Sequence, residues 1–215
     1  MPSFQHDISI KMFNSRCESC PPSYGAILAS AAFLVIFRGL PLDVVEVEHG
    51  GKMSLVTFLN NNEKMSINLP KCKQLLEKQH IFTSGIEKIV KKIFLKHDNK
   101  IALTTSCKDA ELFEDSHLSA LLASDENADF AIAYSKKDDR ITVKPFTPKN
   151  APDLALSAAI AAYESVGERK EMTVSFDVLQ NPCKSSEIIT LAPTFSGTKI
   201  SINAPPLMKF DTPHL

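Results

Sequence analysis

The sequence has no apolar run long enough to cross a membrane. Its longest run, from Ala26 to Phe37, contains Ser30 and falls short of the ~18 residues that a spanning helix needs. Residues 1–7 lack the basic and apolar regions of a secretory signal. These two absences predict a cytoplasmic protein without a membrane partner.

The sequence also lacks an excess of charge of one sign. The net charge is −1, and the basic residues are spread along the chain. The densest basic run, Lys88 to Lys96, has apolar residues between its lysines, as an amphipathic helix with a solvated face would. We therefore expect no nucleic-acid partner. The same run predicts a helix from Ile86 to Lys96 that joins two halves of the chain.

Metal-binding and redox motifs are scarce. Of the five cysteines, only Cys17 and Cys20 are close in sequence, in a C-x-x-C pattern typical of a redox pair or half a zinc site. No second pair of zinc ligands is present, and Pro21 follows directly, whereas a redox C-x-x-C usually opens a helix. The histidines show no metal-ligand spacing either. The pattern favours free thiols in a reducing compartment, with no metal and no cofactor.

What the chain does contain is an internal repeat. The heptapeptide Lys64–Pro70 (KMSINLP) returns as Lys199–Pro205 (KISINAP). Upstream of each copy comes the same series: a β-rich segment ending in Phe, a loop with proline, an alanine-rich helix and further strands. Two copies predict two similar halves related by a pseudo-two-fold axis, with a cleft between them.

The predicted elements define the fold class. Both helices are apolar nearly all round, so we expect each to be surrounded by its own sheet. The prediction is an α+β fold with pseudo-symmetric halves, 1–98 and 99–215, each a curved, mostly antiparallel sheet or half-barrel around a central alanine-rich helix. The first half has a β-rich segment at 8–13, a helix at 25–38 and strands at 43–48, 53–59 and 64–69, with a tight turn at Gly50-Gly51. The second half has strands at 140–146, 171–178 and 187–191, a helix at 154–166 and the second heptapeptide.

The segments around both helix starts resemble one known family. Residues 10–14 (IKMFN) and 26–34 (AILASAAFL) are similar to the R-x-F-T-P and G-H-A-T-L-A motifs of the PhzF family of phenazine-biosynthesis-like isomerases. Residues 144–148 (KPFTP) and 152–159 (PDLALSAA) are similar to the family's second pair of motifs, R-Y-F-A-P and E-D-P-x-T-G-S-A-H. The order of elements agrees over nearly the whole chain. The resemblance implies a diaminopimelate epimerase-like fold, with two similar halves that are each a barrel-like sheet around a helix.

The resemblance also implies a chemistry and a site. Family members isomerise a small carboxylated molecule by proton transfer, and helix N-termini facing the cleft would hold its carboxylate. Asp153 matches the acid of E-D-P and Ser157 matches the Ser of G-S-A. Tyr24 lies where the G-H pair falls and is the candidate donor in place of the absent His. Asp153 before an apolar helix start is also typical of a helix N-cap, a role that can coexist with a functional one, and a loop Tyr such as Tyr24 is more often a packing residue.

Several parts of the family's site are missing. The catalytic Glu of the family has no counterpart, and the glycine-rich stretch of the second half is Cys183–Ser186, without glycine. The chain has only seven glycines, although loops that cradle an anion need them for close backbone approach. Two functions therefore remain open. The chain is either a PhzF-like isomerase or a weakened remnant of one, or a non-catalytic protein with a closed cleft that binds a protein partner or forms a homodimer.

Overall fold

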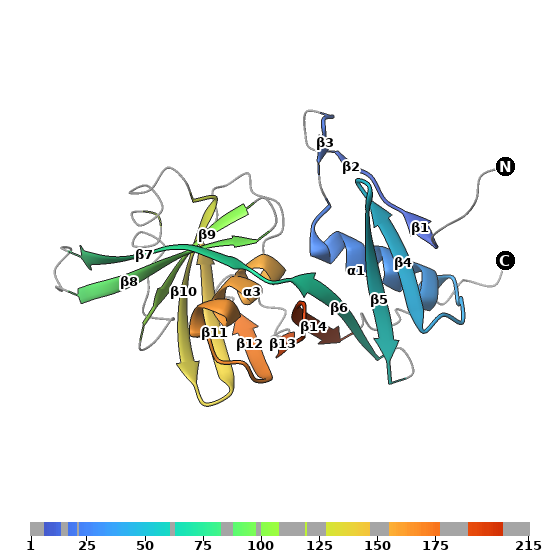
Figure 1. Cartoon of the computed structure of the whole chain (residues 1–215). Coiled ribbons are helices and arrows are strands. Elements are labelled where there is room, and N and C mark those ends of the chain that lie inside the picture. The colour runs from blue at the N-terminus through green and yellow to red at the C-terminus, as the bar shows by residue number, and fades with distance from the viewer. Residues whose placement is uncertain are drawn as a thin grey trace, which may run out of the picture. The chain divides into compact units, whose positions relative to one another are not determined.

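The computed structural model divides by its internal contacts into two compact units (Figure 1). Unit 1 comprises Met1–Ile67 and Ile202–Leu215, and unit 2 comprises Asn68–Ser201. The repeat predicts halves at 1–98 and 99–215, and both these bounds and the pseudo-symmetry of the halves stay predictions. The structure describes residues 7–13, 17–20, 22–60, 63–82, 88–97, 100–107, 119, 128–146, 155–176 and 189–203.

Unit 1 is a small sheet with one helix. The helix α1 (Tyr24–Ala32) continues into a π-helix, η1 (Phe33–Phe37), and α1 contacts strands β4 and β5. Strand β1 lies parallel to β4, and the pairs β4–β5 and β5–β6 are antiparallel. The strand order is β1 (Ile8–Ser9), β4 (Val44–His49), β5 (Lys52–Leu59) and β6 (Lys64–Pro70), while β2 (Met12–Phe13) and β3 (Ser19–Cys20) pair with each other.

Alternation along the strands decides which residues form the core of unit 1. In β4, Val45 and Val47 are fully buried, while Val44 and Glu46 are exposed. Side chains of a strand point alternately to opposite faces, so one face of the sheet is apolar and covered. The buried side chains of α1 (Ile27, Leu28, Ala31 and Ala32) supply the other part of this core.

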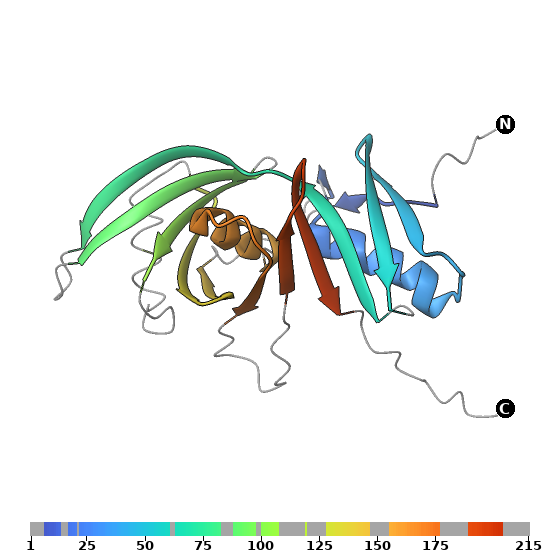
Figure 2. The ribbon, with the colours of Figure 1, turned by 60° about the horizontal axis from the view of Figure 1, so that its bottom comes forward.

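Unit 2 has a larger sheet, and α3 (Ala155–Val166) packs against its strands β8 to β13 (Figure 2). The pairs β9–β10 and β11–β12 are parallel, and the other pairs within the unit are antiparallel. Residues Ala158–Tyr163 of α3 are at most 4% exposed, because the alanines among them let the strands approach closely. The strand order is β14 (Gly197–Asn203), β13 (Ile189–Pro193), β12 (Met172–Phe176), β11 (Arg140–Phe146), β10 (Phe130–Lys137), β9 (Lys100–Ser106), β8 (Lys88–His97) and β7 (Lys73–Phe82).

The tight turn predicted at Gly50-Gly51 is confirmed. The two glycines have φ values of +57° and +77° and connect His49 to Lys52, which pair across the β4–β5 hairpin. A two-residue hairpin turn of this kind needs positive φ at both positions, and glycine adopts it without strain. The Gly51 N–H also donates a hydrogen bond of 2.9 Å to the Glu48 carboxylate.

The helix predicted from Ile86 to Lys96 is wrong. This stretch contains β8, which is antiparallel to both β7 and β9. Ile93 and Leu95, two residues apart, are both buried, so strand alternation sets the burial here. The lysine spacing suits a solvated helix face as well as a strand. Hydrogen bonding to a neighbour on each side, together with the β-branched residues of the segment, favours the strand.

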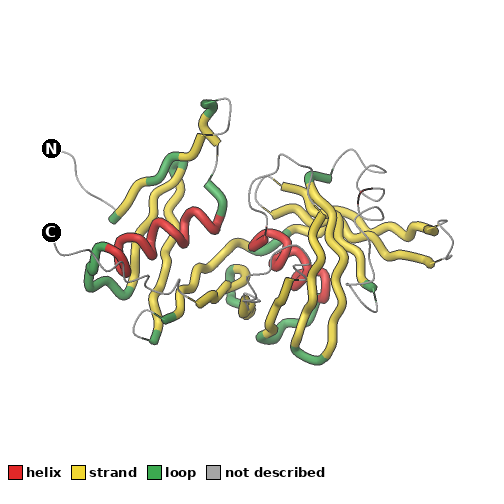
Figure 3. The backbone as a smooth tube through the Cα atoms, turned by 180° about the vertical axis from the view of Figure 1, so that it is seen from behind, coloured by secondary structure: helices red, strands yellow, loops and turns green. Residues whose placement is uncertain are grey.

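The remaining strand predictions are confirmed over the described residues, where their ends shift by one or two residues, except that the segment at 8–13 forms two short strands, β1 and β2. The chain is a mixed α/β protein with a large amount of sheet and few helices (Figure 3). Within the described residues, no helix has the length and apolar character that membrane crossing demands. Whether the alanine-rich helices are the centres of two equivalent half-barrels stays a prediction.

Candidate ligand site at the helix N-termini

The N-terminus of α1 is formed by Ser23 and Tyr24. The backbone of Ser23 is extended (φ −69°, ψ 157°), and its Oγ accepts a hydrogen bond of 3.2 Å from the Ala26 N–H. Serine is a favoured N-cap because it satisfies an N–H group that has no partner within the helix. The first turn holds no acidic residue, so no carboxylate of α1 offsets the positive end of its dipole there.

Both residues at this helix start carry a hydroxyl group in their side chains. Tyr24 is half-buried at the first position of α1. The Ser23 oxygen accepts from the backbone, and its O–H remains able to donate. Hydroxyl donors beside a helix N-terminus suit the oxygens of a carboxylate. A neutral hydroxyl is a poor base for taking a proton from carbon, so this end of α1 suits binding better than proton abstraction.

The N-terminus of α3 lies in unit 2. The helix begins at Ala155 and places Ser157, which is half-buried, in its first turn, where no acidic residue occurs. Asp153 lies outside the described residues, so its proposed contacts stay a prediction. Tyr24 and Ser157 belong to different units, and that they share one site also remains a prediction.

A chain of hydroxyl groups between α3 and the sheet of unit 2 was not predicted from the sequence. Ser165 Oγ donates to the Ala161 carbonyl at 2.7 Å and lies 2.7 Å from Thr104 Oγ1. Thr104 is fully buried and also bonds to the Ile93 carbonyl at 3.3 Å. The hydroxyl of Tyr134 is hydrogen-bonded to Ser165 as well. One serine of α3 thus connects the helix to both β9 and β10.

Tyr134 links this chain to the surface. Its side chain is hydrogen-bonded to the exposed Ser106 and to Ser165. Burial raises the pKa of Tyr134, while hydrogen bonding with Ser106 and Ser165 opposes that rise. The phenol therefore stays neutral at physiological pH and acts as a hydrogen-bonding group that fixes α3 on the sheet. The signal in the sequence was the alternation of Thr104 and Ser106 in β9, which puts both hydroxyls on the face that α3 covers.

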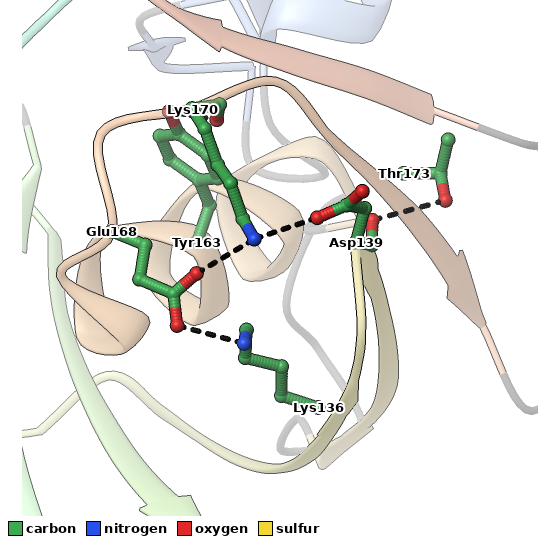
Figure 4. Close-up of polar contacts among 6 residues, drawn as sticks. All are labelled: Lys136, Asp139, Tyr163, Glu168, Lys170 and Thr173. Carbon is green, nitrogen blue, oxygen red and sulfur yellow. Dashed lines mark hydrogen bonds and ion pairs between the residues drawn. The ribbon is translucent and has the colours of Figure 1, made fainter.

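A second polar cluster connects the β10–β11 turn to the segment after α3 (Figure 4). Lys170 Nζ lies 2.7 Å from Asp139 and 3.1 Å from Glu168, and Lys136 Nζ lies 2.7 Å from Glu168. Hydrogen bonding to the lysines and their charge lower the pKa of both carboxylates, and the same contacts raise the pKa of Lys170. The four side chains are 29–70% exposed, so water screens the cluster and it orients this corner rather than forming an enclosed site.

Metal ligands do not gather in the part of the chain that the structure describes. No three His, Cys, Asp or Glu side chains there lie close enough to hold an ion. Cys17 is an exposed free thiol and Cys20 a half-buried one.

Solved structures show what this chain is similar to, whereas its sequence matches no protein-family model and no curated protein. A phenazine biosynthesis PhzC/PhzF protein from Clostridium difficile is 12% identical, with a TM-score of 0.59, over 91% of this chain and 74% of the other. A PhzF-family protein from Bacillus anthracis is also 12% identical, with a TM-score of 0.59, over 94% of this chain and 79% of the other. A predicted epimerase from Pseudomonas aeruginosa is 14% identical, with a TM-score of 0.53, over 90% of this chain and 74% of the other. Identities this low establish the fold. The chain has the fold of the PhzF-family proteins that its motifs resemble.

Proposed function

We propose that this protein binds a small carboxylated molecule at a helix N-terminus, that of α1 in unit 1 or that of α3 in unit 2, and that proton transfer on that molecule is weakened or lost. The observation that carries the proposal is the start of α1. There the Ser23 hydroxyl lies beside the backbone N–H of Ala26, and Tyr24 is half-buried at the first position of a helix whose first turn has no acidic residue. Ser157 offers the same kind of group in the first turn of α3, which also has no acidic residue.

The likeness to PhzF-fold structures supports the substrate class. Neighbours of this fold include a protein described as a predicted epimerase, and epimerisation of a small acid needs a carboxylate site and a group that moves a proton. This chain keeps residue types suited to the first task. For the second, Asp153 is the one group carried over from the family's motifs that could act as an acid or base.

Loss of one positioned acid/base group typically slows proton transfer by about 10²–10⁴-fold. Ser23, Tyr24 and Gly25 stand where the family has its His, so the acid or base that this His would supply is absent here. Binding can survive such a loss, because it depends on donors and on the helix dipole rather than on a base. We therefore expect binding without fast turnover.

Two NMR experiments test these steps separately. The first titrates the labelled protein with a panel of small chiral and unsaturated carboxylic acids, and with the matching amides, which lack the charge. We expect the acids alone to shift amide signals near residues 23–26 and 155–158. Ser157→Ala should weaken binding, and Ser30→Ala is the matched control, since Ser30 lies beyond the first turn of α1 and bonds to the Ala26 carbonyl.

The second experiment incubates the protein with the same acids in D₂O. Deuterium entering a C–H position with the wild type, but not with Asp153→Asn, would establish a working proton-transfer site and refute the proposed loss of catalysis. Binding without exchange supports the proposal. Absence of any acid-specific shift would refute the ligand site itself.

A second candidate function is partner binding. The observation that favours it is the set of large apolar side chains that unit 1 leaves exposed, which include Phe13, Phe33, Phe37, Leu40, Val44, Met53 and Leu55. A protein that had lost its catalysis could be retained for such contacts.

A further inference from the structure

The sheet of unit 1 has an apolar patch on the face that α1 does not cover. α1 packs against β4 and β5 on the other face (Figure 3). The buried side chains of these two strands point to that covered face, namely Val45, Val47, Val56 and Phe58. Because side chains alternate along a strand, the residues between them point away from α1. Among these outward residues, four large apolar ones are 37–53% exposed, and we call them the outward patch: Val44, Met53, Leu55 and Leu59.

Strand pairing makes the outward patch continuous. Met53, Leu55 and Leu59 occupy three of the four outward positions of β5, and Thr57 occupies the fourth. Val44 of β4 pairs with Thr57, so it lies diagonally between Leu55 and Leu59 and within reach of both. The uncovered face of an antiparallel sheet is ordinarily polar. A contiguous apolar patch on such a face therefore indicates an interaction site.

Carboxylates line the outward patch on its β4 side. Glu46 pairs with Leu55 and Glu48 pairs with Met53, so each acid lies directly beside an apolar member of the patch. The Asp7 carboxylate accepts a hydrogen bond of 2.8 Å from the Glu46 N–H, which places a third acid at this side. Glu46 is exposed and forms no ion pair with another described residue. Its charge is therefore available to a partner.

The Glu48 carboxylate is held in place at the same side. It accepts hydrogen bonds from the Ser9 hydroxyl and from the Gly51 N–H. At the other side of the outward patch the charge is positive, because Lys64 of β6 pairs with Leu59. The apolar residues of β5 thus have acids along β4 and a base at one end of β6.

The position of β5 in the sheet decides which form of partner fits. β5 pairs with β4 on one side and with β6 on the other, so it offers no free edge for an added strand, and a partner must be held by side chains. Successive outward residues of β5 are ~6.8 Å apart, while residues four apart in an α-helix are ~6 Å apart along its axis. A helix lying along β5 can therefore set its apolar residues against successive members of the patch. From Met53 to Leu59 the patch is ~20 Å long, which is the length of ~14 helical residues.

We propose that the outward patch binds a basic amphipathic helix of another protein. The apolar side of that helix lies along β5, and its Lys or Arg residues lie beside Glu46 and Glu48. Charge complementarity selects this partner, because an acidic or neutral helix leaves Glu46 without an opposite charge, and a second copy of this chain brings the same carboxylates to the contact. The proposal rests on the second candidate function, partner binding, and gives it a site and a class of partner. It does not depend on the ligand site at a helix N-terminus.

Calorimetric titration with model peptides tests the class of partner. The probe is a peptide of ~14 residues with leucine along one side of its helix and lysine elsewhere. One comparison peptide has the same composition in an order without helical periodicity, and another has glutamate in place of lysine. We expect the probe to bind with a dissociation constant on the order of 10–100 µM, and both comparison peptides to bind at least ~10-fold more weakly.

Variants of the chain locate the contact. Leu55→Ser should weaken binding of the probe ~10-fold or more, because it removes the central apolar contact, and Glu46→Gln should weaken it ~2- to 5-fold. The matched controls should leave binding unchanged. Phe13→Ser removes a similarly exposed apolar side chain that lies outside this sheet, and Glu171→Gln makes the same change of charge in unit 2. Because all four side chains are exposed, the fold should persist, and circular dichroism checks this.

Amide shifts of the labelled protein separate the possible contact surfaces. Shifts concentrated in β4 and β5 on addition of the probe support the proposal. Shifts concentrated in α1 overturn this site, while partner binding through another surface of unit 1 would still stand. Equal binding of the glutamate peptide overturns the class of partner. A probe that does not bind at ~1 mM, or a contact weakened as much by Phe13→Ser as by Leu55→Ser, overturns the proposal as well.

Discussion

Replacing Ser165 should release α3 from the sheet of unit 2. Ser165→Ala removes the partner of Thr104 Oγ1 at 2.7 Å and one hydrogen bond of the Tyr134 hydroxyl. Each such bond contributes roughly 0.5–1.5 kcal/mol, so the loss is about 1–3 kcal/mol. Alanine is the better helix former by about 0.5 kcal/mol, which offsets part of the loss. We expect a net destabilisation of about 0.5–2.5 kcal/mol.

The cost stays moderate because the remaining hydroxyls keep partners. Thr104 still reaches the Ile93 carbonyl at 3.3 Å, and Tyr134 still bonds to Ser106. A buried hydroxyl left with no partner would cost more. The double variant Ser165→Ala, Thr104→Val should therefore lose no more stability than the sum of the two single variants, since it removes both hydroxyls of the hydrogen-bonded pair.

Urea unfolding followed by tyrosine fluorescence measures this effect. The chain has no Trp and three Tyr, of which Tyr134 and Tyr163 lie in unit 2, so the signal reports mainly on that unit. The matched control is Ser30→Ala. Ser30 also donates to a carbonyl one turn earlier in its own helix, at 2.8 Å, and it should be neutral or slightly stabilising. If Ser165→Ala costs no more than Ser30→Ala, the hydroxyl chain does not fix α3.

Two further predictions concern packing and charge. Gly197→Ala should destabilise the fold by about 3 kcal/mol or more, because a Cβ there would clash with the backbone carbonyl oxygen of Leu69. Thermal unfolding measures this effect, and a melting temperature within a degree of the wild-type value would contradict the close approach. In the charged cluster, hydrogen bonding to the lysines lowers the pKa of Glu168 and Asp139 in the folded state. The stability that these carboxylates contribute is therefore present above their unfolded-state pKa of ~4 and is lost as the pH falls through their folded-state pKa. Between pH ~5 and ~2, Lys170→Met should reduce the loss of stability on acidification, and 1 M salt should do the same to the wild type. Melting temperatures across that pH range measure the effect. An unchanged acid dependence would show that the cluster is not coupled to folding.

The strands could be predicted because their signals are local. Alternation in 43–48 and 140–146 fixes which face of a strand is buried, and Gly50-Gly51 permits a turn that other residues resist. The segment at 88–97 failed for a different reason. Its lysines and apolar residues fit the helical period and the strand period alike. Pairing with β7 and β9 selects the strand, and this pairing cannot be read from the segment's own sequence.

The candidate site was harder to predict than the fold. Motif matches could name Tyr24, Asp153 and Ser157, because these lie next to helix starts that the sequence marks clearly. The hydroxyl chain was missed because Thr104, Tyr134 and Ser165 come from three elements that meet only in the folded unit. A single serine in an apolar helix indicates that its hydroxyl needs a hydrogen-bond partner, but the sequence does not show which element supplies that partner.

The same limit explains why the two alanine-rich helices have different fates. An apolar helix of small residues is expected to be buried on all sides, but its sequence does not show which elements cover it. Unit 2 covers α3 with its own strands, so that Tyr163 is buried and its hydroxyl donates to the Lys170 carbonyl at 2.9 Å. Unit 1 covers only part of α1 and leaves Phe33 and Phe37 half exposed. Because the two helices are similarly apolar and differ in how much of them is covered, the exposed part of α1 is a second place where the partner binding proposed above should be tested.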